Sequence, residues 1–321
     1  MNKKIITAGI LSTSAIASIH ILNRIQNFLY TSGKLLSCSE NNYYKWRFGQ
    51  IKYDKKGSGS PILFVHDLTV GSSGYEFNRL INNLTNQHEV YIPDLLGYGL
   101  SDKPSITYTN NLFEQLICDF IKNVIGKRVS VVATGNSVPF IITACHHNPE
   151  LFDKMIFINP QSLYSQNQIP SNQTKLLKFI FETPIIGTFI YNILNTKHQF
   201  EKTFEKEYFY DKSDIKEHYI LNYMEASQLS GCYSKYSFAS FIGKFMNTNI
   251  IHSLKEINNS ILMLGGAKQK DIKTTLENYV YYNNSIEIEY LPETKHLPHL
   301  EAPDKVLEQI ELFFTPLQNF L

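Results

Sequence analysis

The sequence predicts an α/β fold: a mostly parallel central sheet flanked by helices, with a helical insertion. From Trp46 onward, short apolar and β-branched runs alternate with segments of helical periodicity. This alternation stops between residues 161 and 251, where helical, aromatic-rich segments replace it, and it resumes after residue 252. An insertion within one core explains this order better than two tandem domains.

Six core strands are expected, at residues 61–68, 90–94, 128–135, 154–160, 260–266 and 285–291. The clearest helix covers residues 112–125, where Phe113, Ile117 and Ile121 share one face. A final helix is expected over residues 303–317, with Pro303 in its first turn. The predicted units are an N-terminal segment (1–35), a core made of residues 36–160 and 252–321, and the lid (161–251).

Composition and charge limit the classes of protein and partner that are possible. The chain has 321 residues and a net charge of +1, with 43% hydrophobic and 18% charged residues. This composition is typical of a globular protein and excludes wholesale disorder. The balanced charge offers no basic face, so no nucleic-acid partner is expected. No metal or cofactor is expected either, because the cysteines lack paired spacing and read as buried thiols: Cys38, Cys118, Cys145 and Cys232.

The first thirty residues carry a basic pair followed by an uncharged run over residues 5–22. The run is long enough to span a bilayer but contains many Ser and Thr residues, so it could serve as a signal anchor only weakly. An apolar helical stripe follows the segment through Leu11, Ala15, Ser18, Leu22, Ile25 and Leu29. Two interpretations remain open: weak membrane attachment through residues 1–30, or a helix docked on the domain.

A strand-to-helix turn with a serine is expected at residues 135–139, which read Gly-Asn-Ser-Val-Pro. A serine in such a turn projects its hydroxyl above the sheet edge, and the amides around it face the oxygen on which negative charge develops. Pro139 stands where a second small residue is usual. The alternative is that Ser137 simply caps an ordinary helix.

Four motifs occur in order: VHDLTVGSS after the first core strand, VYIPDLLGYGLSDKP after the next, GNSVP after the third, and KHLPHLEAP before the last helix. With them the sequence resembles the α/β-hydrolase superfamily, in the branch that has a serine nucleophile and a helical lid inserted after the sixth strand in the family's own strand count. The resemblance runs from Trp46 to the end of the chain. It implies acyl-enzyme chemistry in which a histidine activates the serine.

The resemblance assigns Ser137 as the nucleophile and His296 as the base. It places the oxyanion hole at the backbone amides of Leu68 and Val138. His66 matches a histidine that is usually structural, and His299 is expected near the site or at the surface. Asp67 replaces the usual glycine after His66, and its carboxylate would oppose an oxyanion unless it is paired or points away.

The carboxylate that orients the catalytic histidine in this superfamily has the weakest match in the sequence. The usual spacing from Gly266 leads to Gln269, and the nearest carboxylate is Asp271. Asp271 is therefore the predicted acid. It is equally well explained as a carboxylate at the start of the helix that follows, in which case the chain lacks an acid.

The predicted function is a serine hydrolase that acts on an apolar, ester-like small molecule. The absence of an aspartate at position 137 disfavours chemistry with a carboxylate nucleophile. Two alternatives are kept: a non-catalytic relative that binds a ligand or partner, and an acyltransferase or lyase that uses the same serine.

Overall fold

The computed structural model describes residues 3–36 and 42–314. Its core is an eight-stranded sheet with the order β1-β2-β4-β3-β5-β6-β7-β8. The strands are β1 Asn42–Trp46, β2 Gly49–Gly57, β3 Ser60–Val65, β4 His88–Pro93, β5 Val129–Thr134, β6 Phe152–Ile158, β7 Ile261–Gly266 and β8 Ile286–Leu291. Strands β3 to β8 are parallel, and β1 and β2 add an antiparallel edge.

The α/β class and the six parallel strands are confirmed. The β1–β2 hairpin was not predicted, because its residues are largely Tyr, Lys, Gln and Asp and form no apolar run. Its partly exposed position at the sheet edge explains that composition.

Helices cover both faces of the sheet. One face packs on α3 (Asn110–Phe120, continued by a π-helical turn Ile121–Ile125), α4 (Val138–His147), α11 (Ile251–Glu256) and α12 (Ile272–Tyr282). The other packs on α2 (Asn78–Leu84) and α14 (Pro303–Phe314). Alternation along each strand produces this division: Leu63 and Val65 face the first layer, and Ile62 and Phe64 the second.

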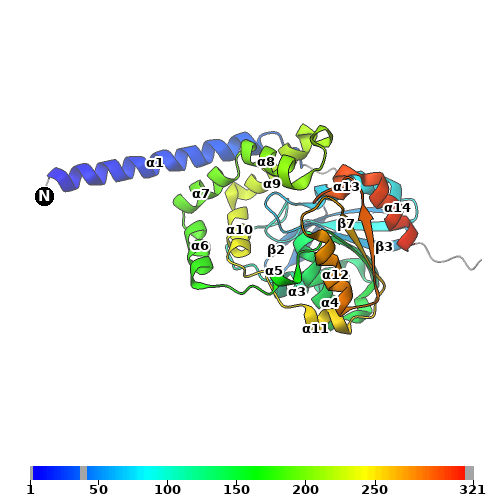
Figure 1. Cartoon of the computed structure of the whole chain (residues 1–321). Coiled ribbons are helices and arrows are strands. Elements are labelled where there is room, and N and C mark those ends of the chain that lie inside the picture. The colour runs from blue at the N-terminus through cyan, green and yellow to red at the C-terminus, as the bar shows by residue number, and fades with distance from the viewer. Residues whose placement is uncertain (1–2, 37–41, 315–321) are drawn as a thin grey trace, which may run out of the picture.

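The chain between β6 and β7 forms the helical insertion, as predicted. Its helices are α5 (Leu163–Gln166), α6 (Asn172–Glu182), α7 (Ile186–Leu194), α8 (Lys197–Thr203), α9 (Glu217–Cys232) and α10 (Ser234–Ile242). Helices α6, α7 and α10 lie on one side of the molecule, whereas α5 lies against α12 of the core. The long helix α1 (Lys3–Thr31) packs against α7 and α9 and projects outward (Figure 1).

Two further predictions concern the termini and the cysteines. The last helix ends at Phe314, and residues 315–321 lie outside the described part of the chain. Cys118, Cys145 and Cys232 are buried free thiols, as expected, whereas Cys38 lies outside the described residues. Within the described ranges, no single helix is both long and apolar enough to cross a bilayer.

Candidate active site

The carboxylate of Asp67 occupies the centre of the site, at the carboxyl ends of β3 and β5. Its Oδ1 atom accepts hydrogen bonds from the backbone amides of Leu68 and Asn136, both at 2.7 Å, and from the Asn136 side-chain amide at 2.9 Å. The side chain is 1% exposed. Two converging backbone N–H groups are the arrangement that stabilises an oxyanion in this type of site. Here they hold the oxygen of a protein carboxylate.

The two backbone amides that hold Oδ1 of Asp67 are not the pair predicted for the oxyanion hole. Leu68 does supply one N–H, but the other comes from Asn136, two residues before Val138. Val138 is instead the first residue of helix α4.

Gly135 explains this shift, because it stands at the apex of the turn between β5 and α4. Its φ is +53°, a left-handed conformation that side chains rarely adopt. A Cβ atom built on Gly135 would lie 2.4 Å from Cγ of Asp67. The turn thus has the pattern small-x-apex-x-small over Ala133, Gly135 and Ser137, and the apex carries no side chain. Asp67 fills the space that a side chain at the apex would take.

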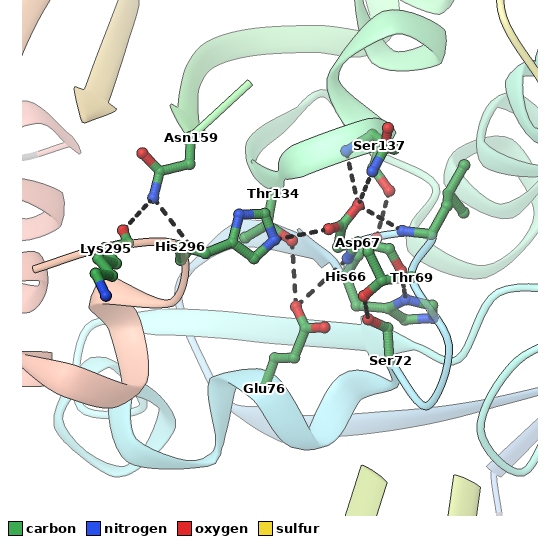
Figure 2. A network of polar contacts seen from close by, with 12 residues as sticks. His66, Asp67, Thr69, Ser72, Glu76, Thr134, Ser137, Asn159, Lys295 and His296 are labelled. Atoms are coloured by element: carbon green, nitrogen blue, oxygen red, sulfur yellow. Dashed lines mark hydrogen bonds and ion pairs between the residues drawn. The ribbon is translucent and has the colours of Figure 1, made fainter. Parts of the chain in front are cut away.

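Ser137 lies past the apex and is fully buried. Its hydroxyl donates to the backbone carbonyl of His66. Figure 2 shows Asp67 between Ser137 and the His296 ring, so the structure does not bring the predicted nucleophile and base together.

His296 reaches the site from the loop before α13 (Pro298–Glu301), and its Nε2 atom lies 3.1 Å from Oδ2 of Asp67. One contact holds the backbone at His296, and another holds its ring. The side-chain amide of Asn159, after β6, donates to the carbonyls of Lys295 and His296 at 2.7 and 2.9 Å. The ring of Tyr208 stacks on the imidazole, with 5.1 Å between the ring centres. His296 thus points at Asp67 as a base points at a nucleophile.

The two groups shift each other's pKa. Burial alone would raise the pKa of Asp67, but hydrogen bonds from His296 and Asn136 outweigh it, and the pKa is lowered. Burial alone would lower the pKa of His296, but the Asp67 carboxylate outweighs it, and the pKa is raised. Both shifts favour a carboxylate beside an imidazolium in the resting protein.

Asp271, the predicted acid, is exposed and lies just before helix α12. Within the described part of the chain, the hydrogen bond and ion pair of the His296 ring go to Asp67, and none joins it to Asp271. The structure therefore supports the reading of Asp271 as a residue at the start of a helix.

A second carboxylate, Glu76, lies behind Asp67 and is also buried. It accepts hydrogen bonds from Thr134 Oγ1 at 3.2 Å and from the Asp67 amide at 3.4 Å. Tyr223, on lid helix α9, donates to it at 3.1 Å. Burial first, and then the charge of Asp67, raises the pKa of Glu76 to about 7. A protonated carboxyl at this position relieves repulsion within the pair.

The two other histidines of the motifs are structural. His66 Nε2 accepts from the Leu95 amide at 2.9 Å, and its Nδ1 lies 2.6 Å from the carbonyl of Asp67, as expected for a structural residue. His299 is fully buried, not at the surface. Burial lowers its pKa to about 3. It therefore faces Glu76, 3.8 Å away, as a neutral ring and not as an ion-pair partner.

Sequence reasoning missed Asp67, Gly135 and Glu76 as site residues. Two signals were present: an aspartate in the place of a glycine, and a second frame for the turn in which Gly135 and not Ser137 is at the apex. Glu76 offered no signal, because its burial depends on packing against Tyr223 of the lid.

Comparisons with known proteins agree with the fold. Residues 62–309 match the model of the alpha/beta hydrolase family. The chain is 24% identical to a soluble epoxide hydrolase of Corynebacterium sp., over 57% of this chain and 67% of that protein. It is 27% identical to a haloalkane dehalogenase of Agrobacterium fabrum, over 35% and 36%. An uncharacterized protein of Mycobacterium bovis is 28% identical over 32% of this chain, and the chain spans only 30% of that relative's length.

Solved structures show the same fold at low identity. The epoxide hydrolase CorEH superposes with a TM-score of 0.70 at 18% identity, covering 87% of this chain and 99% of that one. A membrane phospholipase A superposes with a TM-score of 0.67 at 16% identity and covers 97% of both chains. Together with the sheet order and the family match over most of its length, these findings show that the chain belongs to the alpha/beta hydrolase family.

Proposed function

We propose that the protein is a hydrolase whose nucleophile is the Asp67 carboxylate and whose base is His296. One observation carries the proposal: Oδ1 of Asp67 is held by two backbone amides while Oδ2 faces Nε2 of His296 at 3.1 Å. A carboxylate held in this way can attack a substrate through Oδ2 once its contact with His296 is released, and the amides remain in place to stabilise charge on Oδ1.

The reaction proceeds in two steps. Oδ2 of Asp67 attacks an electrophilic carbon of the substrate, and the bond from that carbon to its leaving group breaks with both electrons going to the leaving group. The product is an ester between Asp67 and the substrate carbon. His296 then takes a proton from a water molecule as the water attacks Cγ of Asp67. The amides of Leu68 and Asn136 stabilise the oxyanion on Oδ1. Its collapse breaks the bond from Cγ to the substrate oxygen, which takes the proton from His296 and leaves as an alcohol. The carboxylic acid so formed loses its proton to solvent, which restores the carboxylate.

The electrostatics suit this order of events. In the resting protein, the negative charge of Asp67 raises the pKa of His296. Esterification removes that charge, so burial then favours the neutral imidazole. The histidine therefore becomes a base at the step that needs one.

The apolar character of the substrate also belongs to this proposal. Next to His296, the lid and the loop after β8 form an apolar cluster that includes Phe204, Tyr208, Tyr223 and Leu297. Apolar surroundings of this kind favour uncharged, apolar molecules. The names of two relatives, a soluble epoxide hydrolase and a haloalkane dehalogenase, are consistent with a carbon electrophile as substrate.

Oxygen labelling tests the proposal directly. In a single turnover in H₂¹⁸O, with a panel of epoxides, alkyl halides and esters, we expect the first product to contain ¹⁶O and Asp67 to acquire ¹⁸O, as measured by mass spectrometry of the peptide. Asp67→Asn should lower turnover by about three powers of ten or more, as loss of a nucleophile does. Ser137→Ala is the matched control and should retain most activity, because it loses only a hydrogen bond worth about 1 kcal/mol of stability.

The alternatives make different predictions. If Ser137 were the nucleophile, Ser137→Ala would abolish turnover, a fluorophosphonate would label Ser137, and Asp67 would take up no ¹⁸O. A non-catalytic relative is favoured by the burial of Asp67 in the oxyanion hole, and it would show neither turnover nor label with any substrate of the panel.

We also propose that the N-terminal segment attaches the protein weakly to a membrane. In helix α1, the predicted stripe residues Ala15, Ser18, Leu22, Ile25 and Leu29 are exposed. An apolar stripe that does not face the protein supports membrane attachment over docking by the apolar face.

A further inference from the structure

We propose that helices α1, α6 and α7 form one surface that docks on an anionic lipid bilayer, so that the lid itself rests on the membrane. The inference rests on the proposed attachment of the N-terminal segment and adds the lid as a second contact.

First, α1 turns its polar face to the protein and its apolar face to solvent, which is the reverse of an ordinary surface helix. Its polar face packs on the lid. Asn23 donates to the carbonyl of Ile185 and accepts from the side-chain amide of Asn192, both at 3.0 Å. Gln26 donates to the carbonyl of Asn192 at 3.1 Å, and Asn27 donates to the carbonyl of Gln228. An ordinary helix turns its apolar face to the protein.

The apolar face of α1 is consequently exposed. Five large side chains follow one another at helical spacing and are between 49% and 70% exposed: Ile21, Leu22, Ile25, Phe28 and Leu29. In water this arrangement is unfavourable, because it leaves apolar side chains in contact with solvent. In a lipid environment the same arrangement is favourable, since the polar groups are satisfied by the lid.

The exposed apolar surface continues onto the two lid helices. Helix α7 packs against both α1 and α6. Six more large apolar side chains are exposed on these two helices: Leu176, Leu177, Phe179, Ile186, Ile193 and Leu194. Helices α6 and α7 together have the length and hydropathy of a membrane span, but the chain bends by 102° between them. A bent apolar pair fits contact with the interface of a bilayer better than a crossing.

The charge of the N-terminal segment favours an anionic surface. Residues 1–39 contain four basic residues, Lys3, Lys4, Arg24 and Lys34, and no Asp or Glu. Each basic residue near an anionic bilayer adds electrostatic attraction to it. A second copy of this chain would present the same positive charge to this surface, so charge favours lipid over self-association.

The placement of the helices agrees with this geometry. Helix α1 projects from the body past α7, and α6 and α7 form the edge of the molecule on that side (Figure 1). The sheet lies at the opposite end. A bilayer met by the projecting helix would therefore also meet the lid and not the core.

Vesicle sedimentation of the full chain tests the inference with three double variants. Ile25→Asn with Phe28→Asn alters α1, and Leu176→Asn with Phe179→Asn alters α6. The matched control is Tyr281→Asn with Leu312→Asn, which changes two exposed apolar residues of the core. We expect the wild type and the control to bind phosphatidylglycerol vesicles more tightly than phosphatidylcholine vesicles. Each of the first two variants should bind about tenfold more weakly, because each loses two apolar contacts.

The outcomes separate the two proposals. If only the α1 variant loses binding, the lid contact is wrong and the attachment through the N-terminal segment stands. If the wild type binds neither kind of vesicle, the attachment itself is wrong. If the wild type is a dimer by light scattering, and both variants are monomers without any change in vesicle binding, a second copy covers this surface and the lipid proposal is overturned.

Discussion

At the scale of single residues, the site depends on two loops whose side chains complement each other. The apex of the turn after β5 carries a glycine, and the loop after β3 carries a carboxylate that fills the vacant space. The motif centred on Ser137 does not reveal this arrangement, because the same turn can be aligned with either Ser137 or Gly135 at its apex. The backbone conformation of Gly135 decides between them, and a sequence does not display a φ angle.

His296 provides the sharpest prediction at this scale. If it activates water only after Asp67 has been esterified, His296→Gln should react once and then stop. Intact-protein mass spectrometry should show a stoichiometric adduct on Asp67, with turnover reduced by two to four powers of ten, about the contribution of a general base. An unmodified variant with no turnover would show instead that His296 is needed for the first step.

At the scale of secondary structure elements, much could be predicted from sequence. Strands β3 to β7 contain apolar runs because both of their faces are covered, and a run of that kind is visible without a structure. The edge strand β8 instead alternates Ile and Glu, a pattern that is equally visible in the sequence. The β1–β2 hairpin has no such run. In the same way, His296 was found from its local motif, whereas Glu76 and Asn159 act through contacts between elements far apart in the chain.

The side chain can be moved from one of these loops to the other by design. In Asp67→Gly with Gly135→Ser, the new side chain at position 135 would occupy the space left by the carboxylate, with the amides of Leu68 and Asn136 around it. We expect this double variant to be labelled by a fluorophosphonate at position 135, slowly because no acid supports His296. Gly135→Ser alone should not be labelled and should be destabilised, because its side chain would collide with Asp67. Labelling of the single variant would contradict our placement of Asp67.

At the scale of the whole molecule, the lid and the core meet at a buried carboxyl. Tyr223 of α9 donates to Glu76, and Tyr208 stacks on His296, so the lid contacts both the rear and the open side of the Asp67–His296 pair. Because Asp67 is only 1% exposed, the proposed reaction requires a substrate to displace part of this contact. The protonation of Glu76 therefore affects the free energy of unfolding as well as the charge of the site.

The pKa of Glu76 predicts how stability changes with pH. Its pKa is raised from 4.5 to about 7 in the folded protein. A group whose pKa is raised on folding contributes stability below its unfolded pKa, and this contribution is lost as the pH rises to the folded pKa. The free energy of unfolding should thus fall by about 3 kcal/mol between pH 4.5 and 7 on account of this group. Glu76→Gln cannot ionise and should escape this loss.

Urea unfolding of both proteins at pH 5 and pH 8 measures the effect. We expect the stability of Glu76→Gln relative to the wild type to be higher at pH 8 than at pH 5, by about 2 to 3 kcal/mol. Differences in hydrogen bonding to Thr134 and Tyr223 are the same at both pH values and cancel. An equal difference at the two pH values would mean that Glu76 ionises as readily in the folded protein as in the unfolded chain, and that the cluster beneath the lid carries two negative charges at neutral pH.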